Sequence, residues 1–158
     1  GHLQKNKVKF IFDLFNLIHS VDSLALAVAI HKKAEILGSC MSILLQVNVS
    51  GETSKFGIDP KNLMEVIRKV APLKGLKVRG LMTITPYDRN PEKSRPHYAR
   101  LRSLRDSCSK LADTGVSLDE LSMGMSNDYE VAVEEGATLV RIGTGLFVDQ
   151  ALKKEKAP

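Results

Sequence analysis

The sequence has no tryptophan, few other aromatic residues and only two cysteines. Its 158 residues include three tyrosines and five phenylalanines. Cys40 and Cys108 lie far apart and lack the spacing of metal ligands, so we expect two buried free thiols, as in a reducing, cytoplasmic compartment. No run of 18 apolar residues is present, which excludes a predicted transmembrane helix. The first residues also lack the pattern of a secretion signal.

The charges and histidines exclude two further classes of function. The net charge is +5, but the basic residues are scattered, and the arginines between 95 and 105 belong to one predicted helix with an apolar stripe. With so few aromatic side chains to stack on bases, we expect no nucleic-acid partner. The lack of a long apolar run predicts no membrane partner. No metal site is expected either, because the four histidines show no ligand spacing (His2, His19, His31 and His97).

Hydrophobic periodicity predicts alternating helices and strands. Helices are expected at 3–15, 24–37, from Asp59 to Lys74, at 91–113 and from Asn127 to Gly136. Strands are expected at 17–21, 43–49, 76–85, 118–123 and 138–142, the third interrupted by Gly80. Strands this apolar are typical of a parallel sheet covered on both faces. Two α/β architectures remain open, a doubly wound sheet and part of a (β/α)8 barrel.

Local signals refine four of these helices. The spacing of Val8, Ile11, Phe12 and Phe15 predicts that the first helix is amphipathic. Asp22 or Ser23 is expected to cap the second helix. In the helix at 91–113, five residues are expected to face inward (Tyr98, Leu101, Leu104, Cys108 and Leu111). Asn127 and Glu130 have the spacing of a capping pair.

Two segments, 122–126 and 140–145, each read as a buried strand that runs into a loop of small residues. Ligands of parallel α/β proteins bind at the carboxyl ends of strands. Gly124, Gly143 and Gly145 taken singly are explained by turn chemistry. Together with neighbouring hydroxyls, their backbone N–H groups predict a cradle for an anion such as phosphate. The hydroxyls belong to Ser122, Ser126 and Thr144.

Arg141 is the most informative single residue of these segments. It lies inside an apolar strand, and alternation places its side chain on the opposite face from those of Val140 and Ile142. An uncompensated buried charge costs several kcal/mol, so the arginine needs a partner. Two interpretations remain open, a structural ion pair with an acid such as Asp128 and contact with a bound ligand.

Five motifs together resemble one family. They are the start Gly-His-Leu-Gln-Lys-Asn-Lys, the loop 46–57, Arg-Gly-Leu-Met at 79–82, Leu-Ser-Met-Gly-Met-Ser-Asn-Asp at 121–128 and Val-Arg-Ile-Gly-Thr at 140–144. The chain is similar, over nearly its whole length, to the pyridoxal phosphate homeostasis proteins. These are single-domain relatives of the barrel domain of alanine racemase.

The resemblance implies a (β/α)8 TIM barrel that binds pyridoxal 5′-phosphate (PLP) and acts as a carrier and buffer of the cofactor, without firm catalytic turnover. It places the phosphate against Ser122 and the backbone of Gly143 and Thr144, and it directs Arg141 at the pyridine nitrogen. The cofactor-binding set it implies is Ser122, Met123, Gly124, Ser126, Arg141, Gly143 and Thr144. Because arginine only donates, the ring nitrogen would stay unprotonated, which suits storage or racemase-like chemistry better than transamination.

The chain departs from the family in its extent. The family's Schiff-base lysine lies on its first strand, upstream of anything in this chain, so no catalytic residue is assigned. We expect residues 1–152 to form strands four to eight of the barrel, with the N-terminal third missing, and 153–158 to be a polar tail. The chain is expected to be a fragment, or to have an upstream segment elsewhere. A self-sufficient open sheet of five strands is a third possibility.

Two other functions remain open from the sequence. One is a PLP-dependent amino-acid racemase, which needs a second acid–base group, commonly a tyrosine; Tyr87 and Tyr129 are the candidates, although neither lies in a matching motif. The other is a generic phosphate-binding α/β module. The complete protein is expected to be a monomer, whereas the fragment is expected to self-associate through exposed sheet edges.

Overall fold

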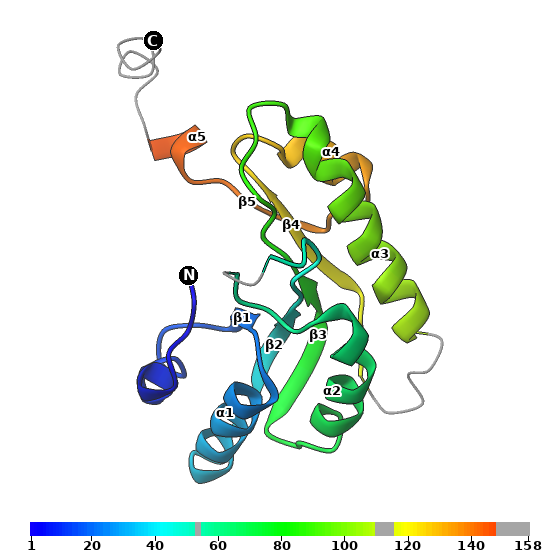
Figure 1. Cartoon of the computed structure of the whole chain (residues 1–158). Coiled ribbons are helices and arrows are strands. Elements are labelled where there is room, and N and C mark those ends of the chain that lie inside the picture. The colour runs from blue at the N-terminus through cyan, green and yellow to red at the C-terminus, as the bar shows by residue number, and fades with distance from the viewer. Residues whose placement is uncertain (53–54, 110–115, 148–158) are drawn as a thin grey trace.

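The chain folds around one parallel sheet of five strands (Figure 1). The computed structural model describes residues 1–52, 55–109 and 116–147. The strands are β1 (Leu17–Val21), β2 (Met41–Gln46), β3 (Leu76–Met82), β4 (Glu120–Met125) and β5 (Leu139–Arg141). Each strand pairs in parallel with the next one along the chain.

The strand order distinguishes between the two predicted architectures. A doubly wound sheet reverses its order at a switch point, which is where its ligands bind. Here the order β1-β2-β3-β4-β5 never reverses, and right-handed crossovers then place every connecting helix on the same face. The result is a parallel half-barrel, so the predicted relationship to a (β/α)8 barrel is confirmed at this level.

All of the α-helices except the last, which buries no residue, cover the outer face of the sheet (Figure 1). The α-helices are α1 (Leu24–Ile36), α2 (Leu63–Val70), α3 (Arg95–Ser109), α4 (Tyr129–Glu134) and α5 (Thr144–Phe147); the 3-10 helices are η1 (Lys5–Phe10), η2 (Pro60–Asn62) and η3 (Pro91–Ser94). Ser23, rather than Asp22, caps α1 by accepting a hydrogen bond from the backbone N–H of Leu26 at 3.3 Å. Tyr98, Leu101 and Cys108 are buried as predicted, and Leu104 packs partly buried against the core.

The first predicted helix, at 3–15, is wrong in type and length. The segment forms the short 3-10 helix η1, which buries Val8 and is followed by buried Ile11. Phe15 is 52% exposed. The two buried residues lie three apart, which suits the three-residue turn of a 3-10 helix, and Phe12 packs partly buried against the core.

Two smaller predictions are also wrong. Asn127 and Glu130 do not form a capping pair, because the N-cap of α4 is Asp128 and the Asn127 amide donates instead to the carbonyl oxygen of Asp88 at 2.9 Å. Cys40 is exposed rather than buried, because it precedes β2 and its thiol lies 3.6 Å from the Lys74 carbonyl oxygen. Cys108 is buried, and burial raises the pKa of its thiol.

The strand that carries Arg141 is less buried than the sequence indicates. Leu139 and Arg141 are half-buried and Val140 is 39% exposed. The cause is position, since β5 is an edge strand that, within the described part of the chain, pairs only with β4. In β4, by contrast, Leu121, Ser122 and Met123 are fully buried as predicted.

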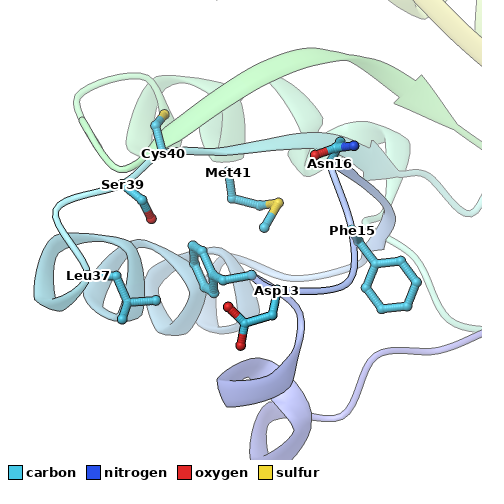
Figure 2. Close-up of a pocket in the computed structure, with 8 residues that line it drawn as sticks. Asp13, Phe15, Asn16, Leu37, Ser39, Cys40 and Met41 are labelled. Atoms are coloured by element: carbon cyan, nitrogen blue, oxygen red, sulfur yellow. The ribbon is translucent and has the colours of Figure 1, made fainter.

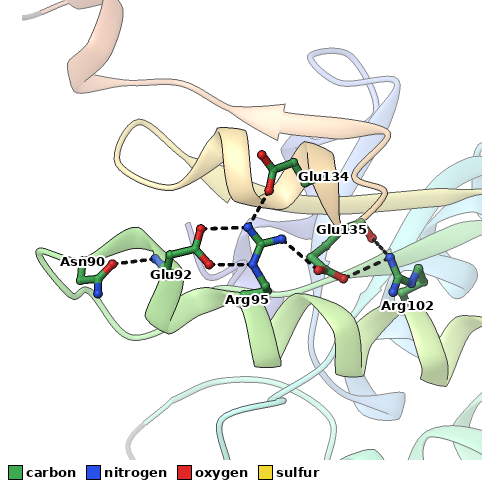
Figure 3. Close-up of polar contacts among 6 residues, drawn as sticks. All are labelled: Asn90, Glu92, Arg95, Arg102, Glu134 and Glu135. Carbon is green, nitrogen blue, oxygen red and sulfur yellow. Dashed lines mark hydrogen bonds and ion pairs between the residues drawn. The ribbon is translucent and has the colours of Figure 1, made fainter.

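An ion-pair network fixes α4 against α3 (Figure 3). The Arg95 guanidinium pairs with Glu92, Glu134 and Glu135, and Arg102 also pairs with Glu135. The hydrogen bonds that Arg95 donates to these three carboxylates raise the pKa of Arg95 above its ordinary value. Glu134 is the last residue of α4 and Glu135 is its C-cap, so the network fastens the end of α4 to α3.

Parts of some predictions fall outside the described residues. These parts are Leu111, the end of the helix predicted at 91–113 and the tail at 153–158. Among the described residues, no helix is both long and apolar enough to cross a membrane. The same residues contain no cluster of three or more side chains able to hold a metal ion.

Candidate functional site

Arg141 is held at the carboxyl edge of the sheet by two neutral acceptors. Its Nη1 donates to Ser122 Oγ at 2.6 Å and its Nη2 donates to the backbone carbonyl oxygen of Thr83 at 2.8 Å. Both acceptors are almost completely buried. Because neither carries a charge, the guanidinium is fixed in place without being neutralised, and its positive charge remains available to an anionic or electron-rich ligand.

The sequence left open an ion pair between Arg141 and Asp128, and the described residues do not form one. Asp128 Oδ2 accepts hydrogen bonds from Tyr98 Oη at 2.6 Å and Ser94 Oγ at 2.7 Å, and Oδ1 accepts from the backbone N–H of Met125 at 2.8 Å. Burial lowers the pKa of Arg141, while Coulombic interactions with Tyr98 and Asp128 oppose that shift. Asp128 therefore affects Arg141 only by long-range electrostatic interaction, without a direct contact.

Asp128 instead ties the loop after β4 to the elements behind it. Burial alone would raise its pKa, but hydrogen bonds from Tyr98, Met125, Ser94 and Thr85 outweigh burial and lower the pKa below its ordinary value. Burial and the bond to Asp128 raise the pKa of Tyr98 to about 12, so the tyrosine remains a donor at neutral pH. The carboxylate is thus a satisfied buried acceptor that sets the loop's shape.

Replacing this carboxylate should destabilise the fold. In Asp128→Asn one acceptor position becomes a donor, and the Tyr98 and Ser94 hydroxyls lose a charged partner. We expect the free energy of unfolding at pH 7 to fall by about 3 kcal/mol, measured by urea titration.

The expected pH dependence has a defined sign. A carboxyl with a lowered folded pKa stabilises the fold above about pH 4 and loses that contribution as the pH falls further. The difference in the free energy of unfolding between wild type and Asp128→Asn should therefore become smaller below about pH 4. Asp106→Asn, on the exposed side of α3, is the matched control and should change little. A gap that widened in acid would contradict this role for Asp128.

His19 is a site residue that the sequence analysis missed. It lies on β1, and its Nδ1 is 2.9 Å from Ser122 Oγ on β4. Together with Arg141 it lines a cavity of about 510 Å³, whose apolar lining includes Ile18, Met82 and Ile84. The histidines were considered only for metal-ligand spacing. The useful signal was a polar ring within an apolar strand, the same signal that singled out Arg141.

The loop after β5 presents backbone N–H groups beside a serine hydroxyl. Ser126 Oγ accepts hydrogen bonds from the N–H groups of Gly143, at 3.2 Å, and Gly145, at 3.0 Å. A Cβ built on Gly143 meets nothing within 4 Å, and its φ lies outside the left-handed region. Neither backbone strain nor packing therefore requires glycine at 143, whereas close approach of a ligand to the backbone would favour it.

Gly124 and Met123 have a different part in the structure. Gly124 has a φ of 90°, and a Cβ there would lie 2.5 Å from that of Ala132. Turn geometry and the packing of α4 therefore explain this glycine, as the plainer interpretation held. Met123 is fully buried in the hydrophobic core, so only its backbone can face a ligand. Thr144 is exposed at the start of α5.

The two candidate acid–base tyrosines make no hydrogen bond with Arg141 in the described residues. Tyr87 is 78% exposed, and the Tyr129 hydroxyl donates to Glu130 at 3.3 Å. The structure thus brings together Ser122, Arg141 and His19, from β4, β5 and β1. Separately it brings Ser126 to the 143–145 loop, and these two segments follow the neighbouring strands β4 and β5.

A second cavity lies at the opposite edge of the sheet (Figure 2). It measures about 370 Å³ and is lined by residues that precede β1 and β2, including Asn16, Ser39 and Cys40. Ligands of parallel α/β folds bind at the carboxyl ends of strands, so we do not expect this cavity at the amino edge to be the ligand site.

Comparison with known proteins identifies the family. The alanine racemase N-terminal domain family matches residues 1–151. The pyridoxal phosphate homeostasis protein of Aquifex aeolicus is 50% identical over 147 residues, which are 93% of this chain and 64% of that protein. The homologue of the same name from Synechocystis is 39% identical over 95% of this chain and 68% of its own length. The chain belongs to this family.

Solved structures of the family share the fold. PipY of Synechococcus elongatus without PLP superposes with a TM-score of 0.86 at 38% identity, over 93% of this chain and 68% of that chain. The PLP-bound form of PipY gives 0.84 at 37% identity. Alanine racemase of Clostridium difficile, at 16% identity and a TM-score of 0.74, shares the fold alone. The chain spans less than two thirds of the length of the Aquifex relative.

Proposed function

We propose that this chain supplies the phosphate- and ring-binding part of a PLP site in a protein that carries and buffers the cofactor. The proposal depends on one observation. Arg141 is held by two neutral acceptors that leave its charge uncompensated, and it lies near the Gly143 loop, whose backbone has open space beside it. The PLP-bound structure of PipY supports it, as do the names of the family's curated members. Two free cysteines fit a reducing compartment, and we therefore place the protein in the cytoplasm.

The site residues divide into two groups in this proposal. The phosphate lies against Ser126 and the backbone of Gly143 and Thr144, whose N–H groups suit an anion. Ser122 is fully buried and already accepts from Arg141, so it supports the ring side rather than meeting the phosphate directly. Gly124 and Met123 shape the strand end between the two groups.

Arg141 also bears on what bound PLP could do. The cofactor supplies an electron sink for amino-acid chemistry, and that sink is strongest when the pyridine nitrogen is protonated. A guanidinium only donates hydrogen bonds, so Arg141 facing this nitrogen keeps it unprotonated. The residue therefore fits storage of PLP better than transamination, and we propose that the protein has no catalytic turnover.

The architecture of the complete site follows from the family. We propose that the five strands are the fourth to the eighth of an eight-stranded barrel, and that residues 1–152 belong to this one domain. None of the lysines in the chain matches the family's covalent attachment point, which lies on the first strand. Binding to this chain alone should therefore be reversible.

A ligand panel tests the proposed function. Isothermal titration should show weak binding of PLP, at least tenfold weaker binding of pyridoxal or inorganic phosphate alone, and no pyridoxyl adduct specific to PLP after borohydride. Ser126→Ala should weaken PLP binding about tenfold, the effect of one lost hydrogen bond to a charged group. Ser107→Ala, on the exposed side of α3, is the control. Equal affinity for PLP and inorganic phosphate would instead favour a generic phosphate-binding module.

The racemase alternative has a direct assay. No hydrogen bond in the described residues connects Tyr87 or Tyr129 with the site, and the family's curated relatives are named as homeostasis proteins. Loss of optical rotation from L-alanine in the presence of PLP would overturn the non-catalytic proposal.

The open sheet edges give a prediction about association. β1 and β5 each pair with one neighbour only, and Phe147 and Leu146 beside β5 are 85% and 72% exposed. Unpaired edges and exposed apolar side chains favour association. We propose that this chain self-associates, whereas a complete barrel is monomeric. Light scattering across a concentration series should show a mass that rises above 17.4 kDa; a constant monomer mass would contradict it.

A further inference from the structure

Three polar side chains from distant parts of the chain form a continuous hydrogen-bonded network on the inner face of the half-barrel. His19 Nδ1 lies 2.9 Å from Ser122 Oγ, which lies 2.6 Å from Arg141 Nη1. His19 and Ser122 are 103 residues apart and come from β1 and β4. The network connects β1, the strand farthest from β5 in the sheet order, to Arg141 on β5.

The hydrogen-bonding capacity of each group fixes the direction of the bond to Arg141, and the need to satisfy the buried serine proton favours one direction for the bond to His19. Arginine has only donors, so Ser122 Oγ must accept from Arg141. The serine hydroxyl has one proton of its own, which then points at His19 Nδ1 as its acceptor. Nδ1 must be unprotonated to accept it, so the neutral ring has its proton on Nε2. Nε2 has no partner among the described residues, and His19 lines the 510 Å³ cavity.

A second proton on the ring would disrupt this arrangement. Nδ1–H and Arg141 would then both donate to Ser122 Oγ, and the buried serine proton would lose its acceptor. The surroundings of the ring also favour its neutral form. Burial, then the charge of Arg141 and that of the amino terminus lower the pKa of His19, whereas the charge of Glu120 raises it. His2 and Arg141 are the other titratable side chains that line the cavity.

We propose that His19 is a positioning residue for PLP, which as a neutral Nε2–H tautomer orients Ser122 and through it the Arg141 guanidinium. Its remaining N–H faces the cavity, where it donates to an acceptor at the edge of the bound ring. The inference rests on the proposed function for its ligand, but the tautomer and the link to Arg141 belong to the chain itself.

Nuclear magnetic resonance of the ligand-free chain tests the link. Long-range nitrogen–proton correlations should show His19 with Nδ1 unprotonated and Nε2 protonated at pH 7.5. Ser122→Ala removes the donor to Nδ1 and should raise the pKa of His19 toward the ordinary value. His97→Gln, on α3, is the control and should leave the His19 signals unchanged. A protonated Nδ1, or no response of His19 to Ser122→Ala, would overturn the proposal.

Binding of PLP tests the positioning role. In His19→Asn the amide oxygen replaces Nδ1 as acceptor for Ser122, whereas in His19→Leu no acceptor remains. We expect about tenfold weaker binding for His19→Leu, the effect of one lost hydrogen bond, and partial recovery for His19→Asn. Equal losses in both variants would indicate simple packing and overturn the positioning role.

The pH profile separates His19 from the ligand. The phosphate of PLP titrates near pH 6 in every sample, so the ratio of wild-type to His19→Asn affinity is the informative quantity. That ratio should fall as the pH drops through the His19 pKa, and a constant ratio would count against the proposal. If even wild type binds no PLP, the proposed function fails and the resonance experiment alone decides the role of His19.

Discussion

Arg141→Ala should weaken the binding of PLP by about a hundredfold. The change removes a guanidinium that two buried neutral acceptors hold in place, and with it the charge that faces the ligand. Truncating one member of a desolvated, hydrogen-bonded charged contact costs about 2–5 kcal/mol, and each 1.4 kcal/mol is a factor of ten in affinity. Isothermal titration at fixed ionic strength measures the loss.

Two further variants show whether geometry or charge is responsible. Arg141→Lys keeps the charge but cannot contact Ser122 and Thr83 through a planar fork, so we expect it to recover only part of the affinity. Arg105→Ala, beside Asp106 on α3, removes an equal charge far from the cavity and should have little effect. Melting curves check that Arg141→Ala is folded. Affinity within threefold of wild type would exclude Arg141 from the ligand site.

The part of the site that sequence could predict is the part made by local pattern. Alternation predicts that the Arg141 side chain lies on the opposite face from those of Val140 and Ile142, because the side-chain period of a strand is fixed by backbone geometry. Reading the two segments as neighbouring strand ends predicts that Arg141 lies near Ser122, and the two side chains are in contact. The same pattern could not show that β5 is an edge strand, since edge or centre depends on which strands pair. For that reason Val140 was expected to be buried and is partly exposed.

The part that could not be predicted depends on contacts between distant residues. The sequence offered Asp128 as an ion-pair partner for Arg141, yet three buried hydroxyls, from η3, α3 and the segment after β3, donate to one of its oxygens. His19 reaches Ser122 across 103 residues. Nothing in the spacing of these residues indicates that they meet, and only the closure of the sheet brings them together.

Glycine shows the same division between local and distant causes. A single interruption at Gly80 in an apolar strand predicts a bulge or a close approach of backbone, but not which one. In the structure both occur. The pairing of β2 and β3 shifts register between Val78 and Gly80, and Gly80 faces the backbone of Glu120 on β4.

Gly80→Ala should have the largest effect on stability of any single methyl addition described above. A Cβ at this position would lie 1.9 Å from the carbonyl oxygen of Glu120 and 2.6 Å from its carbonyl carbon. Both atoms belong to the backbone of the paired strand, so no rotamer change can relieve the clash. Relief requires β3 and β4 to separate where Leu81 pairs with Leu121 and Met82 with Ser122.

This separation would affect the core and the site together. Leu81 and Leu121 are fully buried, and Ser122 and Thr83 provide both acceptors for Arg141. We expect the free energy of unfolding to fall by more than about 4 kcal/mol. Because a domain's total stability is about 5–15 kcal/mol, much of the chain should be unfolded or prone to aggregation at 37 °C. Urea titration and thermal melting of the soluble fraction measure the loss.

Gly143→Ala is the matched control for this prediction. It adds the same methyl group where no atom lies within 4 Å and where φ is ordinary, so its melting temperature should remain within a few degrees of wild type. If Gly80→Ala melted at the same temperature as Gly143→Ala, the close approach of β3 to β4 would be wrong. The pair therefore separates a glycine that the fold requires from one that only a ligand would require.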